Sequence, residues 1–210
     1  MSNPLTGAQF VLAAHRVNQL PADGGAEVAF AGRSNAGKSS ALNALTGHKG
    51  LARTSKTPGR TQQMVAFALP PLAQEGGAAP LPARLIDLPG YGYAKVPEEL
   101  REHWKSEIDS YLHQRRSLRG VVLIADIRHE LKEFDRMMLQ FCFETALPCH
   151  LLLTKADKLS RNQAMRALAA VRKSFADGLQ ANAQVFSSSA GTGVEQAREA
   201  VVRLLNTPRG

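Results

Sequence analysis

Short apolar runs alternate along the chain with longer segments that carry apolar residues on one helical face. Between residues 97 and 114, for example, Leu100, Ile108 and Leu112 recur at helical spacing. The runs that predict strands are 27–31, 65–69, 84–88, 120–125, 149–153 and 184–188. The segments that predict helices are 40–45, 97–114, 131–146, 160–176 and 193–205. This alternation predicts an α/β fold with a mostly parallel, six-stranded sheet and helices on both faces.

Three segments fall outside this alternation. Residues 1–25 contain a short apolar stretch at 10–14, and we expect a helix or strand that packs beside the main domain. Residues 70–82 are rich in proline, glycine and alanine, which predicts an exposed hairpin extension. We therefore expect one domain over residues 26–206, with residues 207–210 as a tail.

Composition narrows the class of protein. The chain has 210 residues, of which 44% are hydrophobic, so one domain with a full core is expected rather than a disordered chain. No apolar run reaches the roughly 18 residues of a membrane-spanning helix, and residues 1–4 lack the basic start of a secretory signal. We expect a cytoplasmic protein in which Cys142 and Cys149 are reduced core thiols.

The chain is strongly basic. Its formal net charge is +8 and its pI is about 9.9. Such a charge favours contact with polyanions such as RNA, or with anionic lipid. Solvated lysines and arginines also keep proteins soluble, so the charge alone does not identify a partner.

A glycine-rich loop stands between the first predicted strand and the first predicted helix. Its sequence fits G-x-x-x-x-G-K-[ST], and its glycines let the backbone curl so that several N–H groups point at phosphate oxygens. A lysine adds a cation for the β- and γ-phosphates, and a serine hydroxyl suits Mg²⁺, which prefers oxygen ligands. The predicted phosphate-binding residues are Gly32, Arg33, Ser34, Asn35, Ala36, Gly37, Lys38 and Ser39.

A D-x-x-G turn follows the strand at 84–88 and comprises Asp87, Leu88, Pro89 and Gly90. At the carboxyl end of a strand, Asp87 is placed to contact a Mg²⁺-bound water. The Gly90 N–H is placed to meet a γ-phosphate where a side chain would clash. The motif is common by itself, and its position downstream of the phosphate loop makes it informative.

A second decisive motif, Thr154-Lys155-Ala156-Asp157, ends the strand at 149–153. A carboxylate there accepts hydrogen bonds from guanine N1–H and the 2-amino group, and adenine offers no such pair of donors. Because adenine would leave the carboxylate desolvated and unpaired, the site would reject it. The alternative is that Asp157 only caps the following helix.

Together these motifs resemble the EngB (YihA/YsxC) family of bacterial Ras-like GTPases, within the TrmE-Era-EngA-EngB-Septin-like superfamily. The residues that carry the resemblance are the phosphate loop with Asn35, T-P-G-R-T-Q around Thr61, D-L-P-G-Y-G-Y-A, T-K-A-D and F-S-S. The similarity covers roughly residues 27–205. Two features depart from the family: the 70–82 insert is longer than the usual hairpin, and Ala36 stands where valine is commoner.

The resemblance implies a single P-loop GTPase domain with further nucleotide contacts. It assigns residues 87–90 to the second switch and residues 154–157 to recognition of the guanine base, and we call the latter the base reader. It assigns Ser39 and Thr61 as Mg²⁺ ligands, and Asp87 as a residue that contacts Mg²⁺ through a water. The implied first switch comprises Gly59, Arg60, Thr61, Gln62 and Gln63. The implied backbone contacts to guanine are Phe186, Ser187 and Ser188.

The implied reaction is slow hydrolysis of GTP to GDP and phosphate, with Lys38, Thr61 and Gly90 as catalytic residues. Tyr91 stands where Ras-type enzymes have the glutamine that orients water, so we expect low intrinsic turnover, below the roughly 1–100 s⁻¹ of kinases. Asn35 resembles an asparagine with which related GTPases bind K⁺. It equally suits a role that only shapes the loop.

The family resemblance implies a partner in the large ribosomal subunit precursor or its rRNA, a link to cell division and septation, and no membrane partner. We expect a monomer. Arg53, Lys56 and Arg60 form a candidate rRNA surface on the first switch, the alternative being a solvated basic loop. Rival functions are a P-loop ATPase or kinase, a membrane-linked GTPase module of the iron-transport type, and a scaffold that only binds nucleotide.

Overall fold

The structure, a computed structural model, describes residues 3–52, 63–72, 79–91, 98–175 and 181–208, without the side chains of 98–101 and 104. The strands are β1 Gln9–Ala14, β2 Ala26–Gly32, β3 Met64–Leu72, β4 Leu81–Asp87, β5 Leu118–Asp126, β6 Cys149–Thr154 and β7 Ala181–Val185. The helices are α1 Lys38–Thr46, α2 Glu98–Gln114, α3 Glu133–Glu144, α4 Arg161–Lys173 and α5 Val194–Asn206, with short 3₁₀ turns η1 Val17–Gln19 and η3 Ala156–Lys158.

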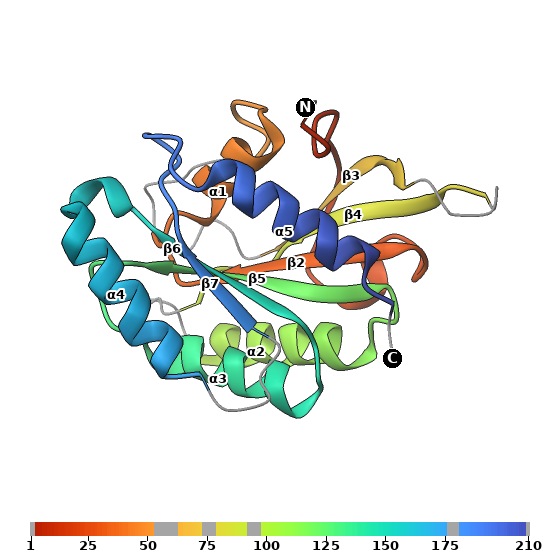
Figure 1. The fold of residues 1–210 in the computed structure, drawn as a ribbon. Coiled ribbons are helices and arrows are strands. Elements are labelled where there is room, and N and C mark those ends of the chain that lie inside the picture. Colours follow the sequence, from red (N-terminus) through yellow and green to blue (C-terminus); the bar gives the residue numbers. More distant parts are fainter. Residues whose placement is uncertain (1–2, 53–62, 73–78, 92–97, 176–180, 209–210) are drawn as a thin grey trace.

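All described strands join one sheet in the order β1-β3-β4-β2-β5-β6-β7 (Figure 1). The five strands from β4 to β7 in this order are parallel, and β3 runs antiparallel to both of its neighbours. Alternate residues of β2 face opposite cores: Ala29 and Ala31 pack with α2, α3 and α4, whereas Val28 and Phe30 pack with α1 and α5. The α/β fold with helices on both faces is confirmed.

Among the described residues the sheet has seven strands, not the six predicted. The additional strand is β1, which pairs with β3 at the edge of the sheet, from Gln9 opposite Ala68 to Ala14 opposite Met64. Of its six residues only Ala14 is buried, and Phe10 is 60% exposed. Because an edge strand with so little burial has no clear alternation of apolar and polar residues, the sequence left helix and strand open here.

The 70–82 insert contributes to the sheet at both ends. β3 continues to Leu72 and β4 begins at Leu81, and these two residues pair with each other. Pro70 is one of the exposed residues at the end of β3. The middle of the insert lies outside the described residues.

Other expectations concern the thiols and the membrane. Cys142 and Cys149 are both free and buried, which confirms the prediction of core thiols. In the described part of the chain, no helix combines the length and the hydropathy that a membrane crossing needs.

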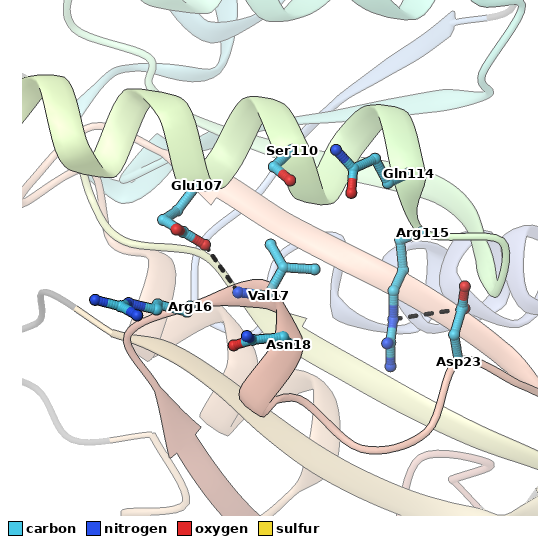
Figure 2. Close-up of a pocket in the computed structure, with 8 residues that line it drawn as sticks. All are labelled: Arg16, Val17, Asn18, Asp23, Glu107, Ser110, Gln114 and Arg115. Carbon is cyan, nitrogen blue, oxygen red and sulfur yellow. Dashed lines mark hydrogen bonds and ion pairs between the residues drawn. The ribbon is translucent and has the colours of Figure 1, made fainter.

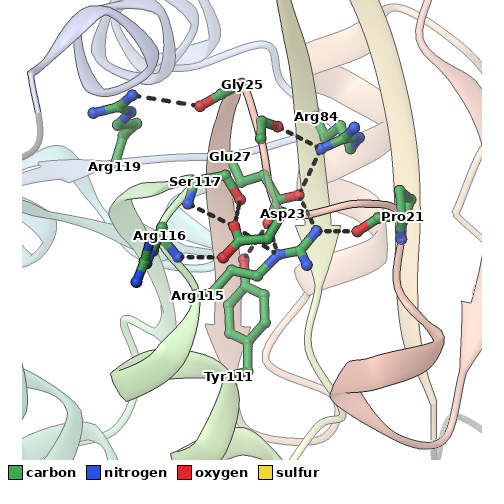
Figure 3. Close-up of polar contacts among 11 residues, drawn as sticks. Pro21, Asp23, Gly25, Glu27, Arg84, Tyr111, Arg115, Arg116, Ser117 and Arg119 are labelled. Carbon is green, nitrogen blue, oxygen red and sulfur yellow. Dashed lines mark hydrogen bonds and ion pairs between the residues drawn. The ribbon is translucent and has the colours of Figure 1, made fainter.

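A buried ionic cluster lies at the beginning of β2 (Figure 3). Glu27 is 0% exposed, and its carboxylate accepts hydrogen bonds from Arg115 at 2.8 and 2.9 Å and from Arg84 at 3.0 Å. The Tyr111 hydroxyl lies 3.3 Å from the same carboxylate. Because a buried charge is tolerated only when it is paired and hydrogen-bonded, this cluster fixes the start of β2, the middle of β4 and the segment after α2 relative to one another.

Replacing Arg115 by methionine should destabilise the fold. The change leaves the Glu27 carboxylate buried with Arg84 as its remaining cation, so we expect the free energy of unfolding to fall by about 3 kcal/mol. Urea unfolding measures this. The control is Arg116→Met, the same change at the adjacent exposed side chain, which should stay within about 0.5 kcal/mol of the wild type. Equal losses in the two variants would contradict the role of the cluster.

Candidate functional site

The predicted motifs meet at the carboxyl ends of neighbouring parallel strands. The phosphate loop follows β2, the D-x-x-G turn follows β4 and the T-K-A-D motif ends β6. In the sheet β4 is adjacent to β2, and only β5 separates β2 from β6. Ligands of parallel α/β sheets bind at this edge, so the topology brings together three segments that are far apart in the sequence.

The phosphate loop has the backbone geometry that an anion site requires. Asn35 (φ 62°) and Gly37 (φ 100°) both adopt left-handed conformations. A Cβ on Gly32 would lie 2.6 Å from the carbonyl oxygen of Ile124, so β2 and β5 could not approach as they do with any side chain there. Gly37 is the N-cap of α1 and offers no side-chain cap, which leaves the N–H groups of the first turn for an anion.

Lys38 and Asp87 contact each other in the structure. The Lys38 ammonium forms an ion pair with Asp87 Oδ1, and both side chains are buried. Burial raises the pKa of Asp87, and the charge of Lys38 opposes that rise. The residue assigned to phosphate and the residue assigned to metal-bound water therefore neutralise one another. For both assignments to hold, binding of phosphate and metal would have to break this ion pair, with Lys38 contacting the phosphate and Asp87 the metal-bound water.

The D-x-x-G turn is joined to the phosphate loop through the backbone. Ser34 N donates to Tyr91 O at 2.9 Å, and Tyr91 N donates to Gly32 O at 3.4 Å. A Cβ on Gly90 would lie 3.4 Å from Ser34 N, an ordinary contact. Contacts within the protein therefore do not require glycine at position 90. That a side chain there would clash with the γ-phosphate stays a prediction.

The Tyr91 side chain points away from the phosphate loop and toward α3. Its hydroxyl donates to Asp135 Oδ1 at 2.7 Å, and its ring stacks on Phe134 with centroids 5.2 Å apart. The pKa of Tyr91 is well above its usual value, first because the hydroxyl is buried and then because Asp135 is close, so the hydroxyl remains protonated. Asp135 is in turn buried, and it accepts a hydrogen bond from Lys132 N at 2.9 Å. The Tyr91 hydroxyl is thus bound to α3 rather than free to orient water.

The Asp157 carboxylate, which the sequence predicts to read the base, is oriented by a serine. Ser187 Oγ donates to Asp157 Oδ1 at 2.6 Å, and Ala156 N donates to Phe186 O at 3.1 Å. The hydrogen bond from Ser187, followed by that from Lys158, lowers the pKa of Asp157. The carboxylate is therefore ionised and fixed in direction. The alternative that Asp157 caps α4 is wrong, because the cap is Ser160, whose hydroxyl accepts from Gln163 N.

Lys155 links the base reader to the phosphate loop. Its backbone is left-handed (φ 59°), and its ammonium lies 2.7 Å from Asn35 O and 2.9 Å from Asp126 Oδ2. Burial opposes ionisation of Asp126, but hydrogen bonds from Arg128 and Lys155 outweigh it and place the pKa far below the usual range. Thr154 Oγ1 adds a second link, since it donates to Ala36 O at 2.5 Å.

Comparisons with known proteins agree with this geometry. A family model described as "50S ribosome-binding GTPase" matches residues 27–155. The probable GTP-binding protein EngB of Xylella fastidiosa is 54% identical over 213 aligned residues, which cover 100% of this chain and 99% of the relative. That of Stenotrophomonas maltophilia is 56% identical over 200 residues, covering 94% and 95%. The chain belongs to the EngB family of GTP-binding proteins.

Solved structures show the same fold. A crystal structure of a probable EngB protein matches with a TM-score of 0.63 over 86% of this chain and 98% of its own, at 22% identity. Era of Aquifex aeolicus matches with a TM-score of 0.65 over 89% of this chain and 57% of its own, at 21% identity. As an EngB protein the chain is a GTPase, which selects this function over the ATPase and scaffold alternatives.

Several predicted residues of this EngB chain lie elsewhere or outside the described residues. Gly59, Arg60, Thr61 and Gln62 are not described, nor are Arg53 and Lys56. Gln63 is described, and its side-chain nitrogen lies 2.8 Å from His15 Nε2, beside the N-terminal segment. Ser188 is exposed, and Ser39 is the second residue of α1.

Two carboxylates and one hydroxyl make contacts near the predicted motifs that the sequence did not predict. Asp126 is the last residue of β5, and its position directly after an apolar run could have indicated this. Asp135 gave no signal, since it reads as an ordinary acidic residue in the first turn of a helix. Ser187 was predicted to contribute through its backbone, whereas its hydroxyl contacts Asp157.

A polar cavity of about 400 Å³ lies away from these motifs, between η1 and α2 (Figure 2). Glu107 on α2 accepts a hydrogen bond from Val17 N at 2.8 Å, and Arg115 lies 3.6 Å from Asp23. Arg115 also contacts Glu27 at the amino end of β2. The cavity is thus at the end of the sheet opposite the phosphate loop.

Ser187→Ala should weaken guanine-nucleotide binding. Without the hydroxyl the Asp157 carboxylate loses its fixed direction, and we expect GDP affinity to fall by a factor of about ten while ADP binds as poorly as before. Competition of labelled GDP by each nucleotide measures this. The control is Ser189→Ala, which removes a hydroxyl that contacts Ser187 Oγ at 3.1 Å and should change GDP affinity less. Unchanged GDP affinity in Ser187→Ala would exclude the orienting role.

Proposed function

We propose that this GTPase hydrolyses GTP slowly to GDP and phosphate as a switch in the assembly of the large ribosomal subunit. The observation that supports it most directly is the contact of Lys155 with Asn35, which joins a guanine-reading carboxylate to a phosphate loop. The family description as a 50S ribosome-binding GTPase supports the partner. A cytoplasmic monomer needed for normal cell division completes the proposal.

Binding divides between two ends of the site. The N–H groups of the phosphate loop and Lys38 contact the phosphates. Asp157 accepts hydrogen bonds from guanine N1–H and the 2-amino group. An adenine nucleotide would leave this ionised carboxylate desolvated without donors, which is the type of penalty that gives a polar site strong discrimination.

The residues around Lys38 suit Mg²⁺. Ser39 follows Lys38 in the sequence, and the Asp87 carboxylate pairs with the Lys38 ammonium, so the site offers hydroxyl and carboxylate oxygens, which Mg²⁺ prefers. Ser39 and Thr61 would bind the metal, and Asp87 would contact one of its waters. When bound, Mg²⁺ neutralises charge on the β- and γ-phosphate oxygens. Lys38 adds its positive charge on the same side as the loop N–H groups.

The switch follows from the shared use of Lys38 and Asp87. When GTP and Mg²⁺ are bound, Lys38 would contact the phosphates and Asp87 a water of the metal, so the ion pair between the two side chains would separate. Gly90 and Thr61 then contact the γ-phosphate, and both switches relax after hydrolysis. Turnover is slow because the Tyr91 hydroxyl is bound to Asp135 and so does not orient the attacking water.

Association with ribosomal particles should depend on the nucleotide. The proposed first-switch cations Arg53, Lys56 and Arg60 belong to the loop that changes with the γ-phosphate. We expect more protein to sediment with large-subunit precursor particles in a non-hydrolysable GTP analogue than in GDP. Phosphate release in GTP checks the same preparation for activity. Sedimentation that ignores both nucleotide and salt would refute a switch on rRNA.

Whether hydrolysis depends on K⁺ can be tested at Asn35. If its side chain binds K⁺ near the phosphates, hydrolysis is faster in KCl than in NaCl, and Asn35→Gly abolishes the difference. Glycine is the suitable replacement because it keeps the left-handed backbone (φ 62°) that the loop needs. Equal rates in the two salts would leave Asn35 with the role of shaping the loop.

A further inference from the structure

Positive charge is concentrated on one helix. α4 carries four basic residues and no acidic one, although the net charge of the whole chain is +8. α2 has five acidic residues against two basic ones, and α3 has three against one. The four basic residues of α4 are Arg161, Arg166, Arg172 and Lys173.

The exposed cations of α4 differ from those of α5, which are paired with carboxylates. On α5, Arg198 pairs with Glu195 and Arg203 lies 3.8 Å from Glu199. Within the described ranges of the chain, no carboxylate lies within 4.0 Å of Arg161, Arg166 or Lys173. Unpaired charges of one sign add to a local positive potential, which paired charges do not.

The fourth cation fixes the helix in place. Arg172 donates two hydrogen bonds to Ala183 O of β7, at 2.7 and 3.2 Å. At the other end the helix begins with a capping box between Ser160 and Gln163. The helix therefore presents its charges on a rigid support.

Apart from Arg172, which is bound to β7, the cations of α4 are spread around the exposed side of the helix. At 3.6 residues per turn, Arg166 and Lys173 lie within about 20° of each other around the helix and about 10 Å apart along it. Arg161, in the first turn, lies about 120–140° from both of them. Met165, which is 50% exposed, lies between Arg161 and this pair on the outward face. This surface, defined by Arg161, Arg166 and Lys173, is called the α4 basic face below.

Helix stability and membrane binding do not account for the whole α4 basic face: the helix dipole favours Lys173 in the last turn but not Arg161. Arg161 is the first residue of the helix, where the helix dipole disfavours a cation. A membrane-bound amphipathic helix needs a free apolar face, but Ala164 and Leu168 of α4 are buried in the core of the domain. A flexible polyanion, whose phosphates repeat along its chain, can reach cations that are spread in this way.

The α4 basic face is distant from the switch turn. α4 packs beside β7, at the edge of the sheet opposite β1 (Figure 1). β7 is four strands from β4, which carries Asp87, a separation of about 19 Å. Contacts made by the α4 basic face therefore do not require the γ-phosphate.

We propose that the α4 basic face binds the phosphate backbone of RNA, and does so in the GDP and GTP states alike. Guanidinium groups match phosphate oxygens in a two-pronged geometry, which suits Arg161 and Arg166 to this contact. That the RNA belongs to a ribosomal particle rests on the proposed function. The physical claim about α4 does not, because it follows from charge and geometry.

The test compares two triple variants with equal charge. One removes the α4 basic face (Arg161→Gln, Arg166→Gln, Lys173→Gln), and the control removes three exposed cations elsewhere (Lys49→Gln, Arg116→Gln, Lys132→Gln). Binding to single-stranded oligouridylate and to an RNA hairpin is measured by anisotropy over a range of KCl concentrations, in GDP and in a GTP analogue. For three lost phosphate contacts we expect the slope of log K against log[salt] on the single strand to fall by about 2 in the α4 variant. GDP affinity should stay at the wild-type level in both variants.

The outcomes separate this proposal from the proposed function. A loss of slope confined to the α4 variant, in both nucleotide states, supports the α4 basic face. Equal losses in the two variants, no loss in the α4 variant, or a loss seen in one nucleotide state only would overturn it. Sedimentation of the α4 variant with large-subunit particles adds a separate result: if RNA binding follows α4 but wild-type protein ignores the particles, the proposed ribosomal role fails and the RNA surface stands.

Discussion

The contact on which the site depends is made by Lys155. From the end of β6 its ammonium reaches the carbonyl of Asn35 at 2.7 Å and the carboxylate of Asp126 at 2.9 Å. Three strands are thereby joined at their carboxyl ends by one side chain. The distance between the phosphate loop and Asp157 must match one nucleotide, and a charge-assisted link of this kind keeps that distance constant.

Both ends of β2 carry buried charges that are neutralised by pairing. At its start Glu27 is surrounded by Arg84 and Arg115, and beyond its end Lys38 pairs with Asp87. The two pairings differ in what they permit. Glu27 is paired with Arg84 and Arg115 at the end of β2 away from the phosphate loop, so its role is to hold the fold together. In the proposed function a metal-bound triphosphate would offer each of Lys38 and Asp87 another partner, so their pairing would be exchangeable while the strand between the two clusters stays in place.

The sequence predicts the parallel core and the three motif loops because both depend on local signals: apolar runs, glycines and short spacings. It leaves β1 undecided, because an edge strand with one buried residue has no periodicity. It misses Asp135 and the role of the Ser187 hydroxyl for another reason. Each acts through a partner far away in the chain, Tyr91 and Asp157, and no local pattern encodes such a pairing.

The proposed switch and the proposed RNA surface lie at different positions in the sheet order. The turn after β4 contains the groups proposed to respond to the γ-phosphate, whereas α4 lies beside β7 and is fixed by Ser160 and Arg172. Long-range electrostatic attraction through α4 would keep the protein near RNA, and the short-range contacts of the switches would then report the nucleotide.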